Sequence, residues 1–273
     1  MAQDRMKVGV VTTSLGLGKD WQQAVAKVAQ MGAEGVQIWV TGYELGPELD
    51  QAQADEVRRE IERQGLILSA TCGEVGGFAE KEHWQQRVEL TEQFLRVTAR
   101  LGAKVMTGHI GVIPADESHP AWKNIYEALG TIARTCEETG VRYAAETGPE
   151  HPLVLRRMLE KVGSPYLGVN YDPANLVMQG YSPEAGLMVL REFVFHTHAK
   201  DGRQLGPNQA QEVPLGQGDV CFPLYLRRLQ EIGYDGFLAI EREGGTDRIG
   251  DVRRAVEFLR QSLGSLRTAA ANG

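Results

Sequence analysis

Apolar and polar residues follow one another along the chain in a repeating unit. In each unit an amphipathic stretch with helical spacing ends at a glycine, and a short run rich in Val, Ile and Leu follows. The units are QMGAEGVQIWV, RQGLILSA, RLGAKVMTG, ETGVRYAAE and EIGYDGFLAIE, with the glycines Gly32, Gly65, Gly102, Gly140 and Gly233. A helix often ends with a left-handed residue, which glycine tolerates, before the chain turns into a strand. Each unit is therefore predicted to be a helix followed by a strand.

Eight apolar runs lie near residues 7, 35, 66, 104, 141, 167, 194 and 237. Three of these strands are expected over residues 7–13, 167–172 and 194–198. Eight alternating units predict a single (β/α)8 TIM barrel in the α/β class. An open doubly wound sheet is the alternative, but TTSLGLGKD lacks the third glycine of a dinucleotide-binding turn.

The helical patterns continue without a Pro/Ser-rich linker or a block of charge, so residues 1–273 are predicted to be one domain. The last residues, SLRTAAANG, have no apolar periodicity, and residues 266–273 are expected to form a frayed tail. The apolar stretch at the start is too short for a signal peptide or a membrane span. We therefore expect a cytoplasmic protein that does not enter a membrane.

The composition is that of a globular protein, with 42% hydrophobic and 24% charged residues. The net charge of -7, without a basic run, argues against binding to nucleic acid. Cys72, Cys136 and Cys221 are odd in number and far apart, which favours reduced thiols in a reducing compartment.

Ionisable residues interrupt the apolar runs at the carboxyl ends of the predicted strands. In a TIM barrel these ends share one mouth, where active sites form. The residues are Glu74, His109, Glu146, Asp172, His196, His198 and Glu241. The sequence therefore predicts a polar site at the mouth of the barrel.

Four of these residues would lie on successive strands 5 to 8. Three carboxylates in a partly dry pocket repel one another, and a divalent cation removes that conflict. Two Glu, one Asp and one His form a mostly oxygen site, which suits Mn²⁺ or Mg²⁺, although Co²⁺ or Zn²⁺ would also bind. The predicted ligands are Glu146, Asp172, His198 and Glu241.

Two of these ligand assignments have alternatives. Asp172 precedes a proline and could simply cap the next helix. His196 lies two residues before His198 on the same face of its strand, and is expected to line the barrel if His198 is the ligand.

Four segments resemble the signatures of the xylose-isomerase-like TIM-barrel superfamily: YAAETG, NYDPANL, HTHAKD with the following PLGQGDV, and GYDGFLAIE. The superfamily includes sugar phosphate isomerases and epimerases, ketose 3-epimerases, hydroxypyruvate isomerases, inosose dehydratases and endonuclease IV. The resemblance covers nearly the whole chain and is strongest after residue 140. Together the segments are specific for the superfamily and not for one reaction within it.

The resemblance implies roles for individual residues. Glu146, Asp172, His198 and Glu241 match the metal ligands, with one divalent ion, Mn²⁺ first, as cofactor. Glu146 and Glu241 match the two glutamates that also move protons. The match to H-x-K-D favours His198 over His196. The residues expected to contact substrate are His109, Asn175, Arg203 and Trp39, together with Lys200 and Glu74 at the mouth.

The chain departs from the family pattern at two places. Gln37 occupies a position on strand 2 that is often acidic, and the loop TGPEHP leaves a further polar contact open between Glu150 and His151. For Lys200 and Asp201, a pair that orients the loop and a contact from Lys200 to substrate are both open.

The leading functional hypothesis is a metal-dependent isomerase or epimerase of a small keto sugar or polyol. Proton transfer would pass through a metal-bound enediolate, because the ion withdraws charge from the carbonyl oxygen. The alternative is a lyase or dehydratase that acts on a keto-inositol or keto-glycoside with the same site. An endonuclease IV-like nuclease fits poorly with the net charge of -7 and 6 His. A barrel that binds a ligand without catalysis is a further alternative. Members of the family are often dimers or tetramers, so the resemblance implies a homo-oligomer.

The loop EREGGTDRIGD after the last strand is where barrels often bind phosphate. Acidic residues would face such an anion, and arginines could offset them; these are Glu243 and Asp247, and Arg242 and Arg248. This balance favours a substrate without phosphate.

Overall fold

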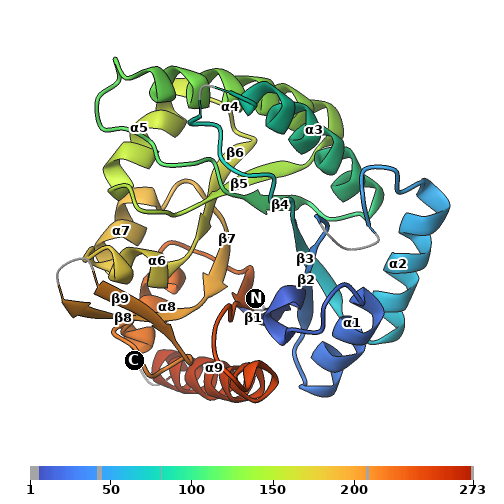
Figure 1. Cartoon of the computed structure of the whole chain (residues 1–273). Helices are drawn as coiled ribbons and strands as arrows, with labels where there is room; N and C mark the ends of the chain where they lie inside the picture. The colour runs from blue at the N-terminus through green and yellow to red at the C-terminus, as the bar shows by residue number, and fades with distance from the viewer. Residues whose placement is uncertain (1–5, 42–44, 81, 207–208, 272–273) are drawn as a thin grey trace.

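The chain folds as a TIM barrel. The structure is a computed structural model that describes residues 6–41, 45–80, 82–206 and 209–271. In these residues eight parallel strands close into a barrel in the order β1-β10-β7-β6-β5-β4-β3-β2, with the helices outside it (Figure 1). The strands are β1 (Lys7–Val11), β2 (Gly35–Trp39), β3 (Ile67–Cys72), β4 (Val105–Gly108), β5 (Arg142–Glu146), β6 (Leu167–Tyr171), β7 (Val194–Ala199) and β10 (Phe237–Ile240). The predicted (β/α)8 barrel is confirmed.

The outer layer is built by the predicted amphipathic stretches. Its helices are α1 (Trp21–Gln30), α2 (Gln51–Arg63), α3 (Trp84–Arg100), α4 (Pro120–Thr139), α5 (Pro152–Val162), α6 (Pro173–Met178), α7 (Pro183–Leu190), α8 (Phe222–Glu231) and α9 (Arg248–Ala271). The five glycines predicted to follow helices have φ angles from 68° to 79°. Only glycine adopts this left-handed conformation without strain, so the turn from helix to strand was readable from the sequence.

The first strand is shorter than predicted. β1 ends at Val11, and Thr12–Leu15 form a 3₁₀ helix, η1. The hydroxyl of Thr12 accepts a hydrogen bond from the Trp39 amide, and the hydroxyl of Ser14 accepts one from the Arg242 amide. These side-chain contacts with neighbouring strand ends replace the ladder that a longer strand would need.

An antiparallel hairpin follows β7, and the sequence pattern did not predict it. Its strands are β8 (Asp201–Gly206) and β9 (Gln209–Val213), and β8 contacts α6. Figure 1 shows the hairpin outside the barrel, beside α6 and α8. Most of its side chains are exposed, so DGRQLG and QAQEV have no apolar run that would mark a strand.

The predicted frayed tail is wrong over most of its length. Helix α9 continues through Ala271, and Leu266 packs against the hydrophobic core. Residues 272 and 273 lie outside the described residues. Leu266 anchors this last part of the helix on the core, and the alanines that follow are strong helix formers.

The core lies between the strands and the helices. Buried aliphatic and aromatic side chains from the helices and most barrel strands form the main cluster, against which Leu68 of β3 packs partly buried. A second, small cluster joins Ala70, Val105 and Ala144. The interior of the barrel itself carries polar side chains that are almost fully buried: Gln37, Thr107, Asn170, His196 and His198. Buried polar groups are costly unless they bond to one another, so this lining points to a site.

Candidate metal and catalytic site

Four of the predicted residues converge at the mouth of the barrel. One ligand atom from each of Glu146, Asp172, His198 and Glu241 lies within 4.8 Å of the others. They stand at the carboxyl ends of β5, β6, β7 and β10, which are consecutive strands in the barrel. All four are buried, at 6%, 0%, 1% and 6% exposure. The structure thus brings His198, and not His196, to this cluster.

The cluster fits a divalent cation. Among the described residues, the buried atoms Oδ2 of Asp172 and Nδ1 of His198 have no hydrogen-bond partner. Such groups are rarely left unpaired in a folded protein unless they serve a ligand. Three carboxylates and one imidazole make a mostly oxygen donor set, and these four residues could hold one metal ion.

Asp172 can act as a cap and a ligand together. Its Oδ1 accepts hydrogen bonds from the amides of Ala174 at 2.8 Å and Asn175 at 3.3 Å, at the start of α6. Its other oxygen, Oδ2, lies 3.7 Å from Nζ of Lys200. The two interpretations of this residue are compatible because each uses a different oxygen.

The orientation of His198 is set from the opposite side of its ring. Its Nε2 lies 3.2 Å from Oε1 of Gln37, whose Nε2 donates to Thr107 at 2.8 Å. Because that donation turns the amide oxygen toward the ring, the proton is assigned to Nε2 of His198. Nδ1 faces Glu241 at 3.3 Å and Glu146 at 3.6 Å. Burial lowers the pKa of His198, but these two carboxylates raise it to about 9, so Nδ1 also carries a proton, which a bound ion would displace. Gln37, the departure from the family pattern, is thus a neutral partner that orients the imidazole.

The amide of Asn170 joins the same network. Its Nδ2 lies 3.1 Å from Nε2 of His198 and 3.2 Å from Oε2 of Glu146. Two donors cannot share a hydrogen bond, so we assign this amide to the Glu146 carboxylate. Its Oδ1 accepts a hydrogen bond from Nδ1 of His196 at 2.9 Å. Both polar atoms of the Asn170 amide therefore have a partner.

Lys200 is a buried, positively charged residue beside the cluster. Its Nζ donates to Glu241 at 2.9 Å and to Glu243 at 2.8 Å, and it is 3% exposed. Burial would raise the pKa of Glu241, but the charges of His198 and Lys200 hold it well below its usual range. Burial raises the pKa of Asp172, which Lys200 only partly offsets. Glu241 is therefore ionised, and Lys200 forms ion pairs with Glu241 and Glu243 rather than with Asp201.

The carboxylate of Glu146 is held by an asparagine at the start of α6. Nδ2 of Asn175 donates to Oε1 of Glu146 at 3.0 Å and to the carbonyl of Thr147 at 3.0 Å. Asn175 thereby fixes this carboxylate in place. Its role as a substrate contact stays a prediction.

His109 and Glu74 form a pair beside Glu146. Nδ1 of His109 lies 2.5 Å from Oε2 of Glu74, and its Nε2 lies 3.7 Å from Oε1 of Glu146. The hydrogen bond to Glu74 outweighs burial and raises the pKa of His109 to about 10. The ring is therefore charged at neutral pH and could donate a proton at the mouth.

The structure separates the two candidates in the loop after β5. Glu150 is buried, and its Oε2 has no hydrogen-bond partner among the described residues. His151 is exposed and caps α5, where its Nδ1 accepts from the Leu153 amide at 3.2 Å. Its ring also lies edge-on to Tyr181, at 5.1 Å between centroids. His151 thus has a structural role, while Glu150 has an unused oxygen.

Two predicted substrate contacts have no described contact with the four-residue cluster. Arg203 lies exposed on β8 and donates to the carbonyl of Gln217. Trp39 ends β2, partly buried against the core. Their roles toward substrate stay predictions.

The supporting residues were harder to find from the sequence. Asn170 precedes Asp172 by two positions and so shares its face of β6, a signal that alternation could have given. Thr147 is bound in both directions to Asp172: its hydroxyl donates to the Asp172 carbonyl at 3.0 Å and accepts from the Asp172 amide at 2.9 Å. No pattern marked this threonine, because the contact joins two adjacent strand ends.

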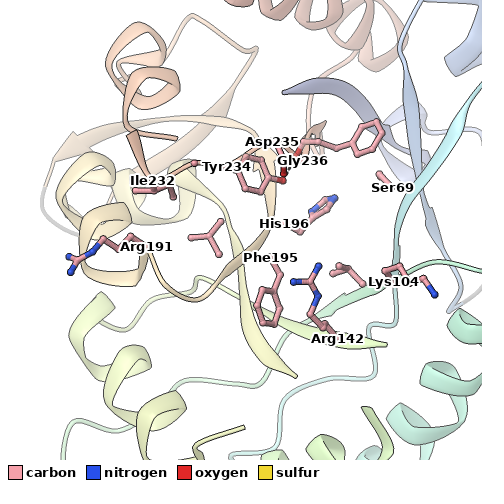
Figure 2. Close-up of a pocket in the computed structure, with 14 residues that line it drawn as sticks. Ser69, Lys104, Arg142, Arg191, Phe195, His196, Ile232, Tyr234, Asp235 and Gly236 are labelled. Atoms are coloured by element: carbon pink, nitrogen blue, oxygen red, sulfur yellow. Dashed lines mark hydrogen bonds between the residues drawn. The ribbon is translucent and has the colours of Figure 1, made fainter. Parts of the chain in front are cut away.

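His196 belongs to the other end of the barrel. It lines a cavity of about 310 Å³ at the amino-terminal ends of the strands, together with Lys104, Arg142 and Arg191. Figure 2 shows its ring among these residues and Phe195. Burial, and then the charge of His198, lower the pKa of His196 to about 3. A neutral ring that lines the barrel is the role the sequence predicted for it.

No helix in the described part of the chain is long and apolar enough to span a lipid bilayer.

Several solved structures share this fold over nearly the whole chain. A xylose isomerase domain protein from Planctomyces limnophilus is 26% identical, with a TM-score of 0.83 over 99% of this chain and 100% of the other. A D-tagatose 3-epimerase-like protein is 20% identical, with a TM-score of 0.80 over 97% and 100% of the two chains. A probable 3-DHS dehydratase from Bacillus anthracis is 18% identical, with a TM-score of 0.76 over 93% and 99%. The last two likenesses show the fold alone.

Two curated relatives match half to two thirds of the chain. The uncharacterized protein MJ1311 of Methanocaldococcus jannaschii is 25% identical over 188 residues, which are 64% of this chain and 62% of that protein. An inosose dehydratase of Clostridium tetani is 24% identical over 157 residues, covering 50% of this chain and 52% of the other.

The sequence model of one family matches residues 25–262, from the first helix to near the end of the last. Its description is Xylose isomerase-like TIM barrel. The match takes in the strands that carry all four residues of the cluster. The chain belongs to the xylose isomerase-like TIM barrel family.

Proposed function

We propose that the protein is a metal-dependent isomerase or epimerase of a small keto sugar or polyol. The observation that carries this proposal is the placement of two buried glutamates, Glu146 and Glu241, on the outer pair of four neighbouring strands. Asp172 and His198 lie between them. Two proton carriers that flank one centre can reach opposite faces of a substrate carbon, which is what inversion of a stereocentre requires.

The surrounding residues give the two glutamates different tasks. Lys200 and His198 keep Glu241 ionised, so it is ready to accept a proton from the carbon beside a carbonyl. Glu146 is bound by Asn170 and Asn175 and lies near the charged ring of His109, so it can return a proton on the other face. A divalent ion held by the four residues would draw charge from the carbonyl oxygen and make that C–H more acidic. Burial of the cluster excludes water from the proton transfers.

Solvent exchange tests the proposal. With Mn²⁺ and a panel of free ketoses in D₂O, the purified protein should incorporate deuterium at the carbon next to the carbonyl, observed by NMR. Glu146→Gln and Glu241→Gln should each lower formation of the epimer by at least about a hundredfold, because each removes one proton carrier. Glu231→Gln is the matched control, because Glu231 is an exposed glutamate at the end of α8. Metal content is measured in every variant, since the two glutamates also serve the ion.

Absence of exchange with every ketose tried, in protein loaded with stoichiometric Mn²⁺, would contradict the proposal.

The second candidate is a lyase or dehydratase, which begins with the same proton abstraction. The charged His109 favours it, because an acid at the mouth could protonate a departing hydroxyl group. Relatives named as dehydratases have the same fold. Mass spectrometry separates the two reactions, since dehydration lowers the product mass by one water and epimerisation leaves it unchanged. In a dehydratase, His109→Asn should suppress loss of water and leave deuterium exchange in place; equal loss of both would argue against this role.

A further inference from the structure

The loop after β10 binds a carboxylate from the hairpin. The amide nitrogens of Glu243 and Gly244 donate to Glu212 on β9, at 3.1 Å to Oε1 and 2.8 Å to Oε2. Nη1 of Arg242 lies 2.8 Å from Oε1 of the same carboxylate. One anion therefore receives two consecutive backbone N–H groups and a guanidinium.

The donors of this site are fixed in place. Arg242 is 7% exposed, and its Nε donates to Oδ2 of Asp251 at 2.9 Å. Gly245 has a φ of +93°, and a Cβ there would lie 2.6 Å from Nη2 of Arg242. Glycine is thus required for the guanidinium to approach the backbone. The arginine keeps its position through Asp251 whether or not Glu212 is present.

This donor set is the kind that binds phosphate. Adjacent backbone N–H groups and an arginine fork are matched to the oxygens of an anion. The loop after the last strand is also a usual place for phosphate in barrels of this type. Here the two amides donate to Glu212 and the guanidinium of Arg242 forms an ion pair with it, so a phosphate group would meet a negative charge where its own oxygens should bind.

The acidic residues expected to repel an anion act elsewhere. Glu243 binds Lys200 through its side chain, and Oδ1 of Asp247 accepts from the Gly250 amide at 3.0 Å. Arg248 donates to the carbonyls of Thr13 and Ser14. The negative charge that would repel a phosphate is that of Glu212, which precedes Glu243 by 31 positions. It lies on β9, a strand that the sequence pattern did not predict.

The anion site adjoins the candidate catalytic site. Glu243 follows Glu241 by two residues, and Lys200 joins their two carboxylates. A sugar whose reacting carbon lay at the cluster would have this loop beside it.

We propose that Glu212 is a specificity-determining residue that fills an anion site formed by Arg242 and the amides of Glu243 and Gly244. It makes the barrel accept uncharged sugars, and its removal opens a site for phosphate. The statement about substrate rests on the proposed function, whereas the anion site does not.

Binding of inorganic phosphate tests the site directly. The full-length protein, wild type and Glu212→Ala, is titrated with phosphate by calorimetry, with EDTA present and chloride holding the ionic strength constant. Gln211→Ala is the matched control, because Gln211 is the exposed neighbour on the same strand. We expect Glu212→Ala to bind phosphate at least tenfold more tightly than the wild type and the control. Replacing Arg242 by Gln in the Glu212→Ala background should remove the gain.

A second variant protects the test against a folding defect. Glu212→Gln keeps the volume of the side chain and removes its charge, so it should also gain affinity for phosphate. Folding of each variant is followed by thermal denaturation. Equal phosphate affinity in folded wild type, Glu212→Gln and Glu212→Ala would overturn the proposal, as would a gain that survives loss of Arg242.

The outcomes distinguish this inference from the proposed function. If Glu212→Ala gains phosphate binding but no ketose exchanges deuterium, the anion site stands and the function falls. If free ketoses exchange and no variant gains phosphate affinity, only the role of Glu212 falls. With both intact, the ratio of exchange rates for phosphorylated over free ketose should rise at least tenfold in Glu212→Ala.

Discussion

At the scale of single residues, burial decides which charges do chemistry. Glu146, Asp172 and Glu241 are carboxylates in a nearly dry setting, and each has a polar partner from another strand or strand end. The charges of such neighbours determine whether a carboxylate is ionised. The sequence predicted these residues because acidic side chains interrupt apolar runs. It did not predict that Lys200 would bind Glu241, or that Asn170 and Asn175 would bind Glu146.

Glu150 gives a residue-scale prediction. Burial raises its pKa to about 7, against backbone N–H groups that lower it. The native state therefore holds a proton that the unfolded chain releases near its usual pKa of about 4.3, so stability falls as pH rises from that value through 7. At pH 8 the ionised form should cost about 4 kcal/mol, at about 1.4 kcal/mol for each pH unit between the two pKa values.

Glu150→Gln removes that cost. In urea denaturation at pH 8 the variant should be more stable than the wild type by about 4 kcal/mol, and the difference should vanish toward pH 4. The exposed Glu231→Gln is the control and should show no such pH dependence. A difference that stayed constant between pH 4 and pH 8 would count against a buried proton on Glu150.

At the scale of elements, the alternating helices and strands could be predicted from the sequence, whereas the hairpin β8–β9 could not. Helix and strand units follow from apolar spacing and a glycine, both of which are local signals. The hairpin β8–β9 is held instead by contacts with distant residues. The carboxylate of Asp201 accepts four backbone N–H groups, from Gly202, Gly216, Gly218 and Val220. A Cβ on Gly218 would lie 2.1 Å from Oδ1 of Asp201, so this loop closes only around a glycine.

Asp201→Asn should therefore loosen the hairpin and its loop. The amide that replaces one carboxylate oxygen is a donor and cannot accept, so at least one backbone N–H loses its partner. We expect a loss of about 2 kcal/mol in free energy of unfolding, with faster hydrogen exchange at the amides of Gly216 and Gly218. Asp219→Asn is the control, because Asp219 accepts a single exposed hydrogen bond, from the Gln204 amide. Unchanged exchange at both glycines would show that Asp201 does not organise the loop.

At the scale of the whole molecule, closure of the barrel creates the site. Residues as far apart as Gln37 and His198 meet because β2 and β7 face one another across the interior. The three carboxylates among the candidate ligands repel one another, so a bound cation should stabilise the entire fold.

Metal linkage is the prediction that belongs to this scale. Mn²⁺ at a hundred times its dissociation constant should raise the free energy of unfolding of EDTA-treated protein by about 2.7 kcal/mol, read as a rise in Tm. Asp172→Asn keeps a side chain that can cap α6 and removes the ligand charge, so its Tm should respond far less. Asp219→Asn should respond like the wild type. If Mn²⁺ stabilised Asp172→Asn and the wild type equally, the ion would be binding elsewhere.

The sequence by itself determined the barrel, the order of its units and the four residues at the ends of neighbouring strands. These features depend on residue spacing along the chain, and parallel strands bring their carboxyl ends to one mouth by geometry. Only the tertiary structure decided which ring nitrogen of His198 faces the carboxylates and which carboxylate fills the loop after β10. Those outcomes depend on contacts such as Gln37 with His198 and Glu212 with Gly244, between residues that no local pattern links.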